Sequence, residues 1–224
     1  MPEPATTPAP APAAVPDRRP TTLGSVTSGA QLVADARTQA ATLLEPMGDR
    51  WRHTIAVSAR AATTAARLGV DTNLAEAAAW LHDIGYAQAI AVTGFHPLDG
   101  AEHITRLGWP ARIAGLIAYH SGARYVAALR GLSARLSAFV DEEGLLSDTL
   151  TYADQTTGPR GEPMTFEQRH AEMLHRHGPD SWNAKADHIR GPFLRDLVAR
   201  IDHLRQRDRH KGKPVPLIDH LGPR

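Results

Sequence analysis

The 224-residue chain contains no cysteine. Without cysteine the protein can form neither disulfides nor thiolate zinc sites, and it has no thiol nucleophile. This composition is consistent with a reducing compartment, and we expect a cytoplasmic protein. The sequence also lacks the apolar run behind a basic N-terminus that marks a secretory signal, and it lacks an apolar run long enough to cross a membrane.

A strong excess of charge is missing as well, because the formal net charge is only +1. Neither this charge nor any basic patch indicates binding to a nucleic-acid polymer, so we expect a small-molecule substrate and no membrane partner. Alternating runs of valine or isoleucine, which would indicate a β-sheet, are also absent. We therefore expect an all-α protein.

Composition divides the chain into three parts. Proline and alanine dominate residues 1–28, which we predict to be a disordered arm. Arginine and lysine are frequent after residue 204, followed by proline and glycine, so residues 205–224 are predicted to be a basic flexible tail. The intervening residues 29–204 are numerous enough to bury a single core.

Within residues 29–204 the apolar residues recur at helical spacing, which predicts a helical bundle. Gly69 and Gly108 directly follow two of these apolar patterns, as glycines at helix C-termini do. Helices are expected near residues 29–45, 48–68, 73–84, 97–107, 110–120, 123–137, 144–157, 165–177 and 183–205.

The most informative motif is Leu81-His82-Asp83-Ile84-Gly85-Tyr86, which places two metal-ligand residue types near the end of an alanine-rich helix. Burying either side chain without a partner would cost several kcal/mol. The motif therefore indicates a hydrogen-bonded pair, an exposed helix end or a metal site.

Four further ligand-type residues are His53, His96, His120 and Asp154. His53, His120 and Asp154 share helix faces with apolar residues and should point into the core, whereas His96 precedes Pro97 at the start of a predicted helix. A single buried histidine is equally well explained by donation to a backbone carbonyl. Several such residues on separate elements favour a metal site, and imidazole with carboxylate suits manganese, iron, zinc or nickel.

The order of these residues resembles the defining pattern of the HD superfamily of metal-dependent phosphohydrolases. That pattern is a histidine, a His-Asp doublet and a distant aspartate, supplied here by His53, His82-Asp83 and Asp154. His96 and His120 look like the extra pair of dinuclear members, similar to small bacterial proteins that hydrolyse dinucleoside polyphosphates. The resemblance covers roughly residues 29 to 204 and is more specific for metal binding than for substrate.

The resemblance implies an HD-domain helical bundle with a metal site in its core and one or two divalent ions, with iron, manganese, nickel, zinc and magnesium left open. It implies that one ion is held by His53, His82, Asp83 and Asp154. Asp83 would bridge to a second ion held by His96 and His120, and the ions would activate a water for phosphoester hydrolysis. Asp83 is thus the expected catalytic residue. Its replacement by alanine should abolish turnover without unfolding the chain, because alanine is a good helix former.

Three residues are candidates for substrate binding: Arg124, Thr157 and Arg160. Gly122 can turn the chain so that Arg124 reaches back as a fork for a phosphate, although a surface arginine is slightly favoured. Thr157 and Arg160 closely follow Asp154, but a helix-end hydroxyl and a loop arginine explain them equally well.

The function expected from these features is a metal-dependent phosphohydrolase that cleaves a small, nucleotide-like phosphoester. A dinuclear iron oxygenase is the alternative, because some HD relatives with the same six ligand types oxidise organic substrates. A non-catalytic sensor or binding module is a third alternative. The expected partner is a small phosphorylated substrate, and a homodimer is left open because dimers are common among proteins of this resemblance.

Overall fold

The computed structural model describes residues 28–211 of the chain. Most of the predicted arm, residues 1–27, and the end of the predicted tail, residues 212–224, lie outside this range. Within the described range the regular structure is helical, and an isolated bridge between Thr157 and Pro163 is the β-type pairing found there. The prediction of an all-α fold is confirmed.

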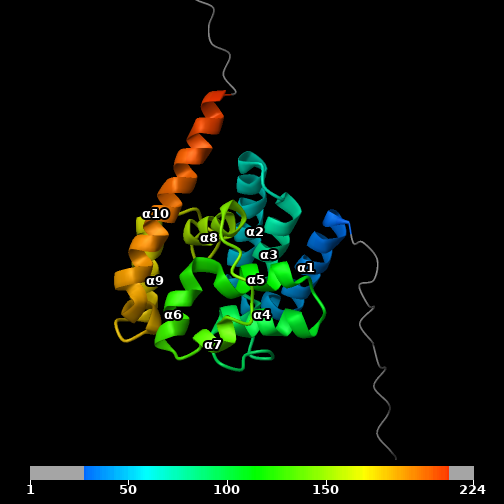
Figure 1. Ribbon diagram of the computed structural model, residues 1–224, viewed down its shortest axis with the longest axis vertical. Helices are drawn as coiled ribbons and strands as arrows, with labels where there is room; N and C mark the ends of the chain where they lie inside the picture. The colour runs from blue at the N-terminus through cyan, green and yellow to red at the C-terminus, as the bar shows by residue number, and fades with distance from the viewer. Residues whose placement is uncertain (1–27, 212–224) are drawn as a thin grey trace, which may run out of the picture.

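The helices in residues 28–211 follow one another along the chain with short connections (Figure 1). The α-helices are α1 (Gly29–Leu44), α2 (Asp49–Leu68), α3 (Thr72–Leu81), α4 (His96–Arg106), α5 (Ala111–Tyr119), α6 (Ala123–Leu129), α7 (Ser133–Leu136), α8 (Leu145–Gln155), α9 (Phe166–His177) and α10 (Trp182–Lys211). Short 3₁₀ helices are η1 (Glu45–Met47), η2 (Ile84–Tyr86) and η3 (His120–Gly122).

Alanine side chains allow the central helices to approach one another closely. Helix α3 packs between α1 and α2 and also contacts α5, while α2 packs against α8 and α4 against α5. The facing residues are small and fully buried, for example Ala61 and Ala65 of α2 and Ala77 and Ala78 of α3. Their shared core brings the inner faces of α2, α3, α5 and α8 to one point, where the candidate site lies.

Two of the expected helices are shorter in the structure. Helix α3 ends at Leu81 instead of continuing to residue 84, because the chain turns into the 3₁₀ helix η2 and Asp83 has φ −106° and ψ 4°. The expected helix 123–137 is divided into α6 and α7 at Gly131, whose φ of 67° is left-handed and cannot continue an α-helix.

The last helix is longer than expected. Helix α10 continues to Lys211, so the first seven residues of the predicted flexible tail are helical. Leu194 and Ile201 are fully buried and pack with Tyr152 of α8 and Phe166 of α9, which fixes α10 against the bundle. In Figure 1, α9 and α10 lie on one side of the bundle and α1 on the other, and the end of α10 extends beyond the remaining helices.

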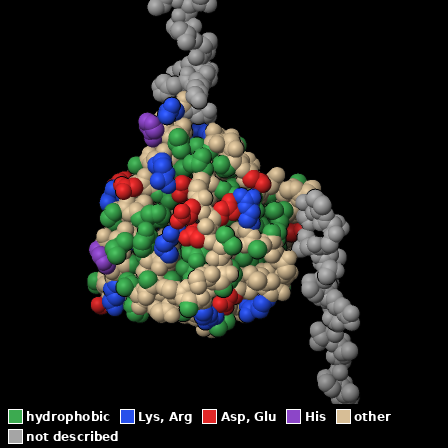
Figure 2. Space-filling view, viewed as in Figure 1, with side chains coloured by type: hydrophobic (Ala, Val, Ile, Leu, Met, Phe, Trp, Pro, Cys, Tyr) green, Lys and Arg blue, Asp and Glu red, His purple; other side chains and the backbone are tan. Residues whose placement is uncertain are grey.

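The viewed surface carries acidic and basic side chains interspersed with apolar ones, without a large area of one charge (Figure 2). This pattern agrees with the small net charge of the sequence. Among residues 28–211, no helix combines the length and apolar character that a membrane span requires.

Candidate metal centre

The structure brings together the six residues that the sequence singled out as metal ligands. They form two groups of three, each with ligand atoms within 4.8 Å of one another: His53, His82 and Asp154 in the first, and Asp83, His96 and His120 in the second. The residues come from α2, the turn after α3, the start of α4, the start of η3, and α8. Five of them are buried and His96 is half-buried, so the groups lie inside the bundle.

Backbone carbonyls orient three of the histidines. A carbonyl oxygen can only accept a hydrogen bond, so the ring nitrogen facing it carries the proton and the other nitrogen keeps its lone pair. The three Nδ1 atoms donate over 2.9, 2.7 and 2.6 Å in the pairs His53 to Gly158, His82 to Ala79, and His120 to Ile117. Each Nε2 is thereby prepared to bind a metal, as in metal sites whose histidines are fixed through the second nitrogen.

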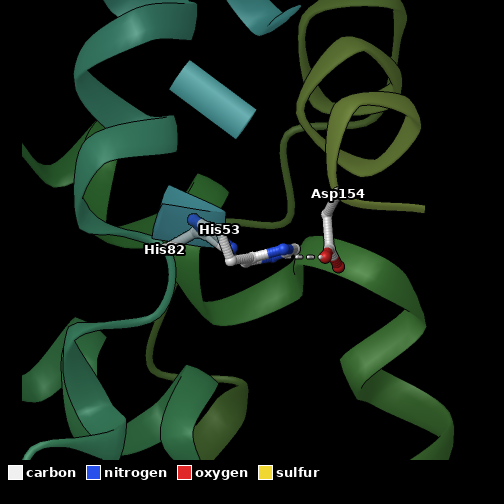
Figure 3. Close-up of side chains that lie close together, drawn as sticks. All are labelled: His53, His82 and Asp154. Atoms are coloured by element: carbon white, nitrogen blue, oxygen red, sulfur yellow. Dashed lines mark hydrogen bonds and ion pairs between the residues drawn. The ribbon is translucent and has the colours of Figure 1, made fainter. Parts of the chain in front are cut away.

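The carboxylates face these nitrogens. Figure 3 shows the first group, in which His53 Nε2 lies 3.2 Å from Asp154 Oδ1. The two oxygens of Asp83 face different groups, since Oδ2 lies 3.3 Å from His82 Nε2 and Oδ1 lies 3.4 Å from His96 Nε2. Asp83 therefore has the placement of a carboxylate that bridges two ions.

The unsatisfied atoms of this cluster fit bound cations. His82 Nε2 is buried and makes no hydrogen bond within residues 28–211, although Asp83 Oδ2 lies nearby. The Nε2 atoms of His96 and His120 face each other at 3.3 Å, where two lone pairs would repel without a cation or a proton between them. Ligands bonded at about 2.1 Å to one tetrahedral ion are separated by about 3.4 Å. The observed separations match that spacing.

Burial and neighbouring charges keep most of the cluster in the protonation states that metals require. Burial alone would raise the pKa of Asp83, but the charges of Arg50 and His82 hold that pKa well below its usual value. Burial lowers the pKa of His96 well below its usual value and also lowers that of His120. His82 is the exception, because the Asp83 carboxylate outweighs burial and raises its pKa, so protons compete with a metal there as the pH falls.

The orientation of Asp154 depends on Ser121, which has φ 53° and ψ 34°. Ser121 Oγ donates a short hydrogen bond to Asp154 Oδ2, and Gln155 Nε2 donates to the same oxygen over 2.8 Å. Because these bonds occupy Oδ2, Oδ1 is left facing His53. Among residues 28–211, Ser121 is the one non-glycine residue with a positive φ, and such backbone strain is typical of functional sites.

We predict that Ser121→Ala weakens metal binding about tenfold, because the carboxylate of Asp154 loses a donor that fixes its orientation. Ser121→Gly removes the same hydroxyl but relieves the left-handed backbone, so it should be more stable than Ser121→Ala by roughly 1 kcal/mol and equally weak in metal binding. Calorimetry of a metal titration measures the affinity for metal, and urea denaturation measures the stability. Unchanged metal affinity in both variants would contradict this role.

Arg124 does not reach the metal-ligand groups, and the prediction that it does is wrong. Its guanidinium lies 2.7 Å from Asp141 and 3.3 Å from Glu143, and it lines a different surface depression that includes Glu143. The acidic segment after α7 supplies these partners, and only the tertiary structure places that segment beside α6. The alternative of a surface arginine is the correct one.

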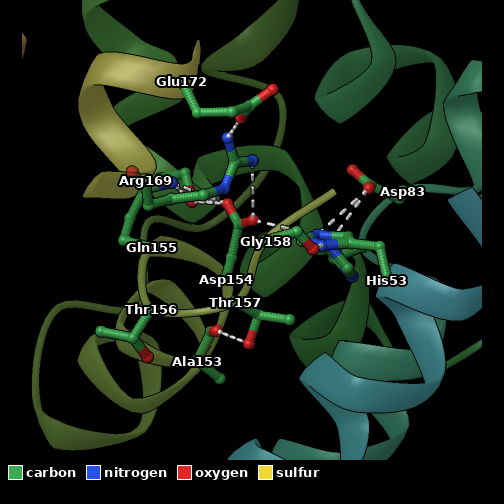
Figure 4. Close-up of polar contacts among 12 residues, drawn as sticks. His53, Asp83, Ala153, Asp154, Gln155, Thr156, Thr157, Gly158, Arg169 and Glu172 are labelled. Atoms are coloured by element: carbon green, nitrogen blue, oxygen red, sulfur yellow. Dashed lines mark hydrogen bonds and ion pairs between the residues drawn. The ribbon is translucent and has the colours of Figure 1, made fainter. Parts of the chain in front are cut away.

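Thr157 and Arg160 also lie outside the cavity next to the metal-ligand groups. The buried hydroxyl of Thr157 donates over 2.7 Å to the carbonyl of Ala153 within its own helix end, as Figure 4 shows. Arg160 is exposed, and its backbone N–H donates to the carboxylate of Glu162. Thr157 and Arg160 are therefore close to Asp154 in the sequence but do not line the same cavity.

The cavity is instead lined by basic residues that the sequence analysis did not select. They are Arg50, Arg169, Arg176, His177 and Arg190. Arg50 could have been found, because it precedes His53 by three residues and so lies on the same face of α2. The other four lie on the charged helices α9 and α10, where no pattern in the sequence indicates which side chains point towards the cavity.

Arg50 contacts the second group of ligand residues, both directly and through Tyr86. Its Nη1 lies 2.6 Å from Asp83 Oδ2, and its guanidinium lies 4.2 Å from the ring centre of Tyr86. Tyr86 stacks on His96, with ring centres 4.0 Å apart and an interplanar angle of 17°. Burial, together with the negative charge of Asp83, raises the pKa of Tyr86 to about 12, so Tyr86 is an uncharged platform for both neighbours.

Comparison with known proteins places most of the described chain in one family. A model of the HD domain matches residues 50–179. Curated relatives include ribonuclease Y of Chloroflexus aurantiacus, 46% identical over 69 residues, which are 31% of this chain and 14% of the relative. Ribonuclease Y of Acetivibrio thermocellus is 41% identical over 70 residues, which are 31% of this chain and 13% of that relative. No solved structure matches significantly.

Proposed function

Because the chain belongs to the HD domain family, we propose that it is a metal-dependent phosphohydrolase that cleaves a small, nucleotide-like phosphoester. HD domains typically hydrolyse phosphoesters with bound divalent metals, and the buried histidine and aspartate groups of this chain are suited to such ions. The single observation that carries the proposal is the placement of Asp83, whose two oxygens face the two groups. A cavity lined by arginines adjoins them.

In this proposal His53, His82 and Asp154 would hold one ion, His96 and His120 would hold a second, and Asp83 would be a ligand shared by both. When bound, two such ions acidify a water and neutralise the phosphoryl oxygens. Hydrolysis forms one bond between phosphorus and the oxygen of water and breaks the bond to the leaving oxygen, which takes up a proton. The ligand residues fix the position of the reacting phosphate, and the arginines hold the negatively charged substrate beside them.

The arginines favour a phosphoester over an uncharged organic substrate. Guanidinium groups match phosphate oxygens in charge and in fork geometry, whereas burying them beside a neutral substrate would leave their charge uncompensated. The relatives named ribonuclease Y add support for a nucleotide-type phosphoester. The chain covers only 14% or less of the length of those relatives, so their activity on RNA is not transferred as a whole.

We expect EDTA to abolish phosphoester turnover and an added divalent ion to restore it. The test combines metal analysis of the purified protein with a panel of nucleotides, dinucleoside polyphosphates and a short RNA, assayed with manganese, iron, nickel, zinc or magnesium. His53→Ala should lose metal and activity, because its Nε2 is removed from the first group. His188→Ala is the matched control, since His188 is exposed and lies outside the cavity.

Two results would overturn the proposed function. One is an absence of metal-dependent release of phosphate or nucleotide from every phosphoester in the panel. The other is oxygen consumption by an iron-loaded protein acting on an organic substrate without cleavage of a phosphoester. Cleavage of the RNA alone would retain the chemistry but replace the small substrate with a polymer.

A further inference from the structure

Two arginines opposite the metal-ligand residues are almost completely buried yet line the same cavity. Arg169 of α9 and Arg190 of α10 each expose only 6% of their surface. Arginine keeps its charge at any pH a protein tolerates, and it is rarely buried without an acidic partner. Their position therefore requires an explanation beyond packing.

Arg190 lacks the partners that a buried guanidinium requires. Its Nε donates over 2.8 Å to the carbonyl of Ser121, which fixes the side chain at the cavity. Its Nη1 is buried and has no hydrogen-bond partner in the part of the chain that the structure describes, and Arg190 forms no ion pair there. Burial lowers the pKa of Arg190, although the charge of Asp154 acts in the opposite direction.

Arg169 is compensated only in part. Its Nη1 lies 2.7 Å from Glu172 Oε2, and its Nη2 lies 3.8 Å from Asp154 Oδ1, as Figure 4 shows. Its Nε is buried without a hydrogen-bond partner among residues 28–211. Glu172 also accepts from Arg176, so one carboxylate serves two guanidinium groups.

The balance of charge in the cavity is positive. Four arginines line it, and the carboxylates that line it are Asp83 and Asp154. An anion placed between Arg169 and Arg190 would satisfy their free donors and restore the balance.

We propose that Arg169 and Arg190 form a phosphate-binding subsite that is separate from the metal ligands and binds its phosphate without metal. This inference rests on the proposed function for its place in the reaction, but the binding itself does not need turnover. The proximity of Arg169 to Asp154 places the subsite next to the first metal-ligand group. The phosphate is either a second phosphate of the substrate or free inorganic phosphate.

Calorimetry with inorganic pyrophosphate and phosphate on the metal-free protein tests the subsite directly. We expect both anions to bind, and we expect Arg190→Met to weaken their binding at least tenfold. Arg190→Lys keeps the charge but loses the fork, so it should lie between the two. Arg124→Met is the matched control and should bind like the parent, because its guanidinium is paired with Asp141 and Glu143 away from the cavity.

Circular dichroism establishes that each variant is folded. If Arg190→Met does not fold, because the bond to Ser121 is lost, Arg169→Gln provides the same test from α9. Unchanged anion affinity in a folded variant, or no binding of either anion to the parent protein, would overturn the subsite. Anion binding without phosphoester turnover would instead contradict the proposed function and leave the subsite supported.

Kinetics on the metal-loaded protein distinguishes the two sources of phosphate. If the subsite holds a second phosphate of the substrate, Arg190→Lys should raise KM about tenfold for a nucleoside diphosphate and leave KM for the monophosphate unchanged. If it holds free phosphate, the variant should leave both KM values unchanged and relieve inhibition by inorganic phosphate. A variant identical to the parent in both assays would contradict the subsite.

Discussion

Asp83→Asn is expected to lower phosphoester turnover at least about a thousandfold, which corresponds to about 4 kcal/mol of lost transition-state stabilisation. The carboxylate places one oxygen 3.3 Å from His82 Nε2 and the other 3.4 Å from His96 Nε2. Asparagine keeps the shape of the side chain but has a single oxygen and no negative charge, so it cannot bridge two ions. We therefore also expect bound metal to fall to one ion or none per chain.

Folding of the variant needs its own control, because Asp83 is also the partner of Arg50. The sequence predicted that Asp83→Ala would stay folded because alanine is a good helix former. That reason does not apply, since Asp83 follows the end of α3. Arg50→Gln combined with Asp83→Asn removes the unpaired cation and should remain folded. Asp180→Asn, at an exposed position, should behave like the parent. A folded Asp83→Asn protein with full metal content and activity would contradict the bridging role.

Gly85→Ala is expected to destabilise the protein by about 3 kcal/mol, the upper part of the range for overpacking. A Cβ atom at Gly85 would lie 2.1 Å from the carbonyl oxygen of His96 and 2.8 Å from the backbone nitrogen of Gly100. Both atoms belong to the backbone of α4, so the helix itself must move. We expect His96 to shift away from Asp83 and His120, with loss of the second metal before the first. Urea denaturation and metal analysis measure the two effects.

Gly108→Ala is the matched control for this substitution. Gly108 has φ 78° with no atom within 4 Å of an added Cβ, so alanine there meets only the backbone strain of a left-handed residue, about 1 kcal/mol. Equal stability of Gly85→Ala and Gly108→Ala would show that α4 yields to the added methyl without cost. The same metal content in Gly85→Ala and the parent would contradict the proposed displacement of His96.

The helical fold and the six ligand residues could be predicted because their signals are local. Apolar spacing along each segment decides which face of a helix is buried, so His53, His120 and Asp154 could be placed inside before any packing was known. The His82-Asp83 doublet added a strong family resemblance, and the HD match supports it. Helix ends were less well predicted, because the stop after Leu81 depends on η2 packing against α4.

By itself, then, the sequence determined the fold class, the family and the set of candidate metal ligands, since each depends on residue types at fixed spacing. Only the tertiary structure decided which cations surround the cavity beside the candidate metal ligands. Arg124, Thr157 and Arg160 are near ligand residues in the chain but outside the cavity, whereas Arg169 and Arg190 are distant and line it. A long arginine side chain can reach in many directions, so the docking of α9 and α10 on the bundle, and not the local pattern, fixes where its charge lies.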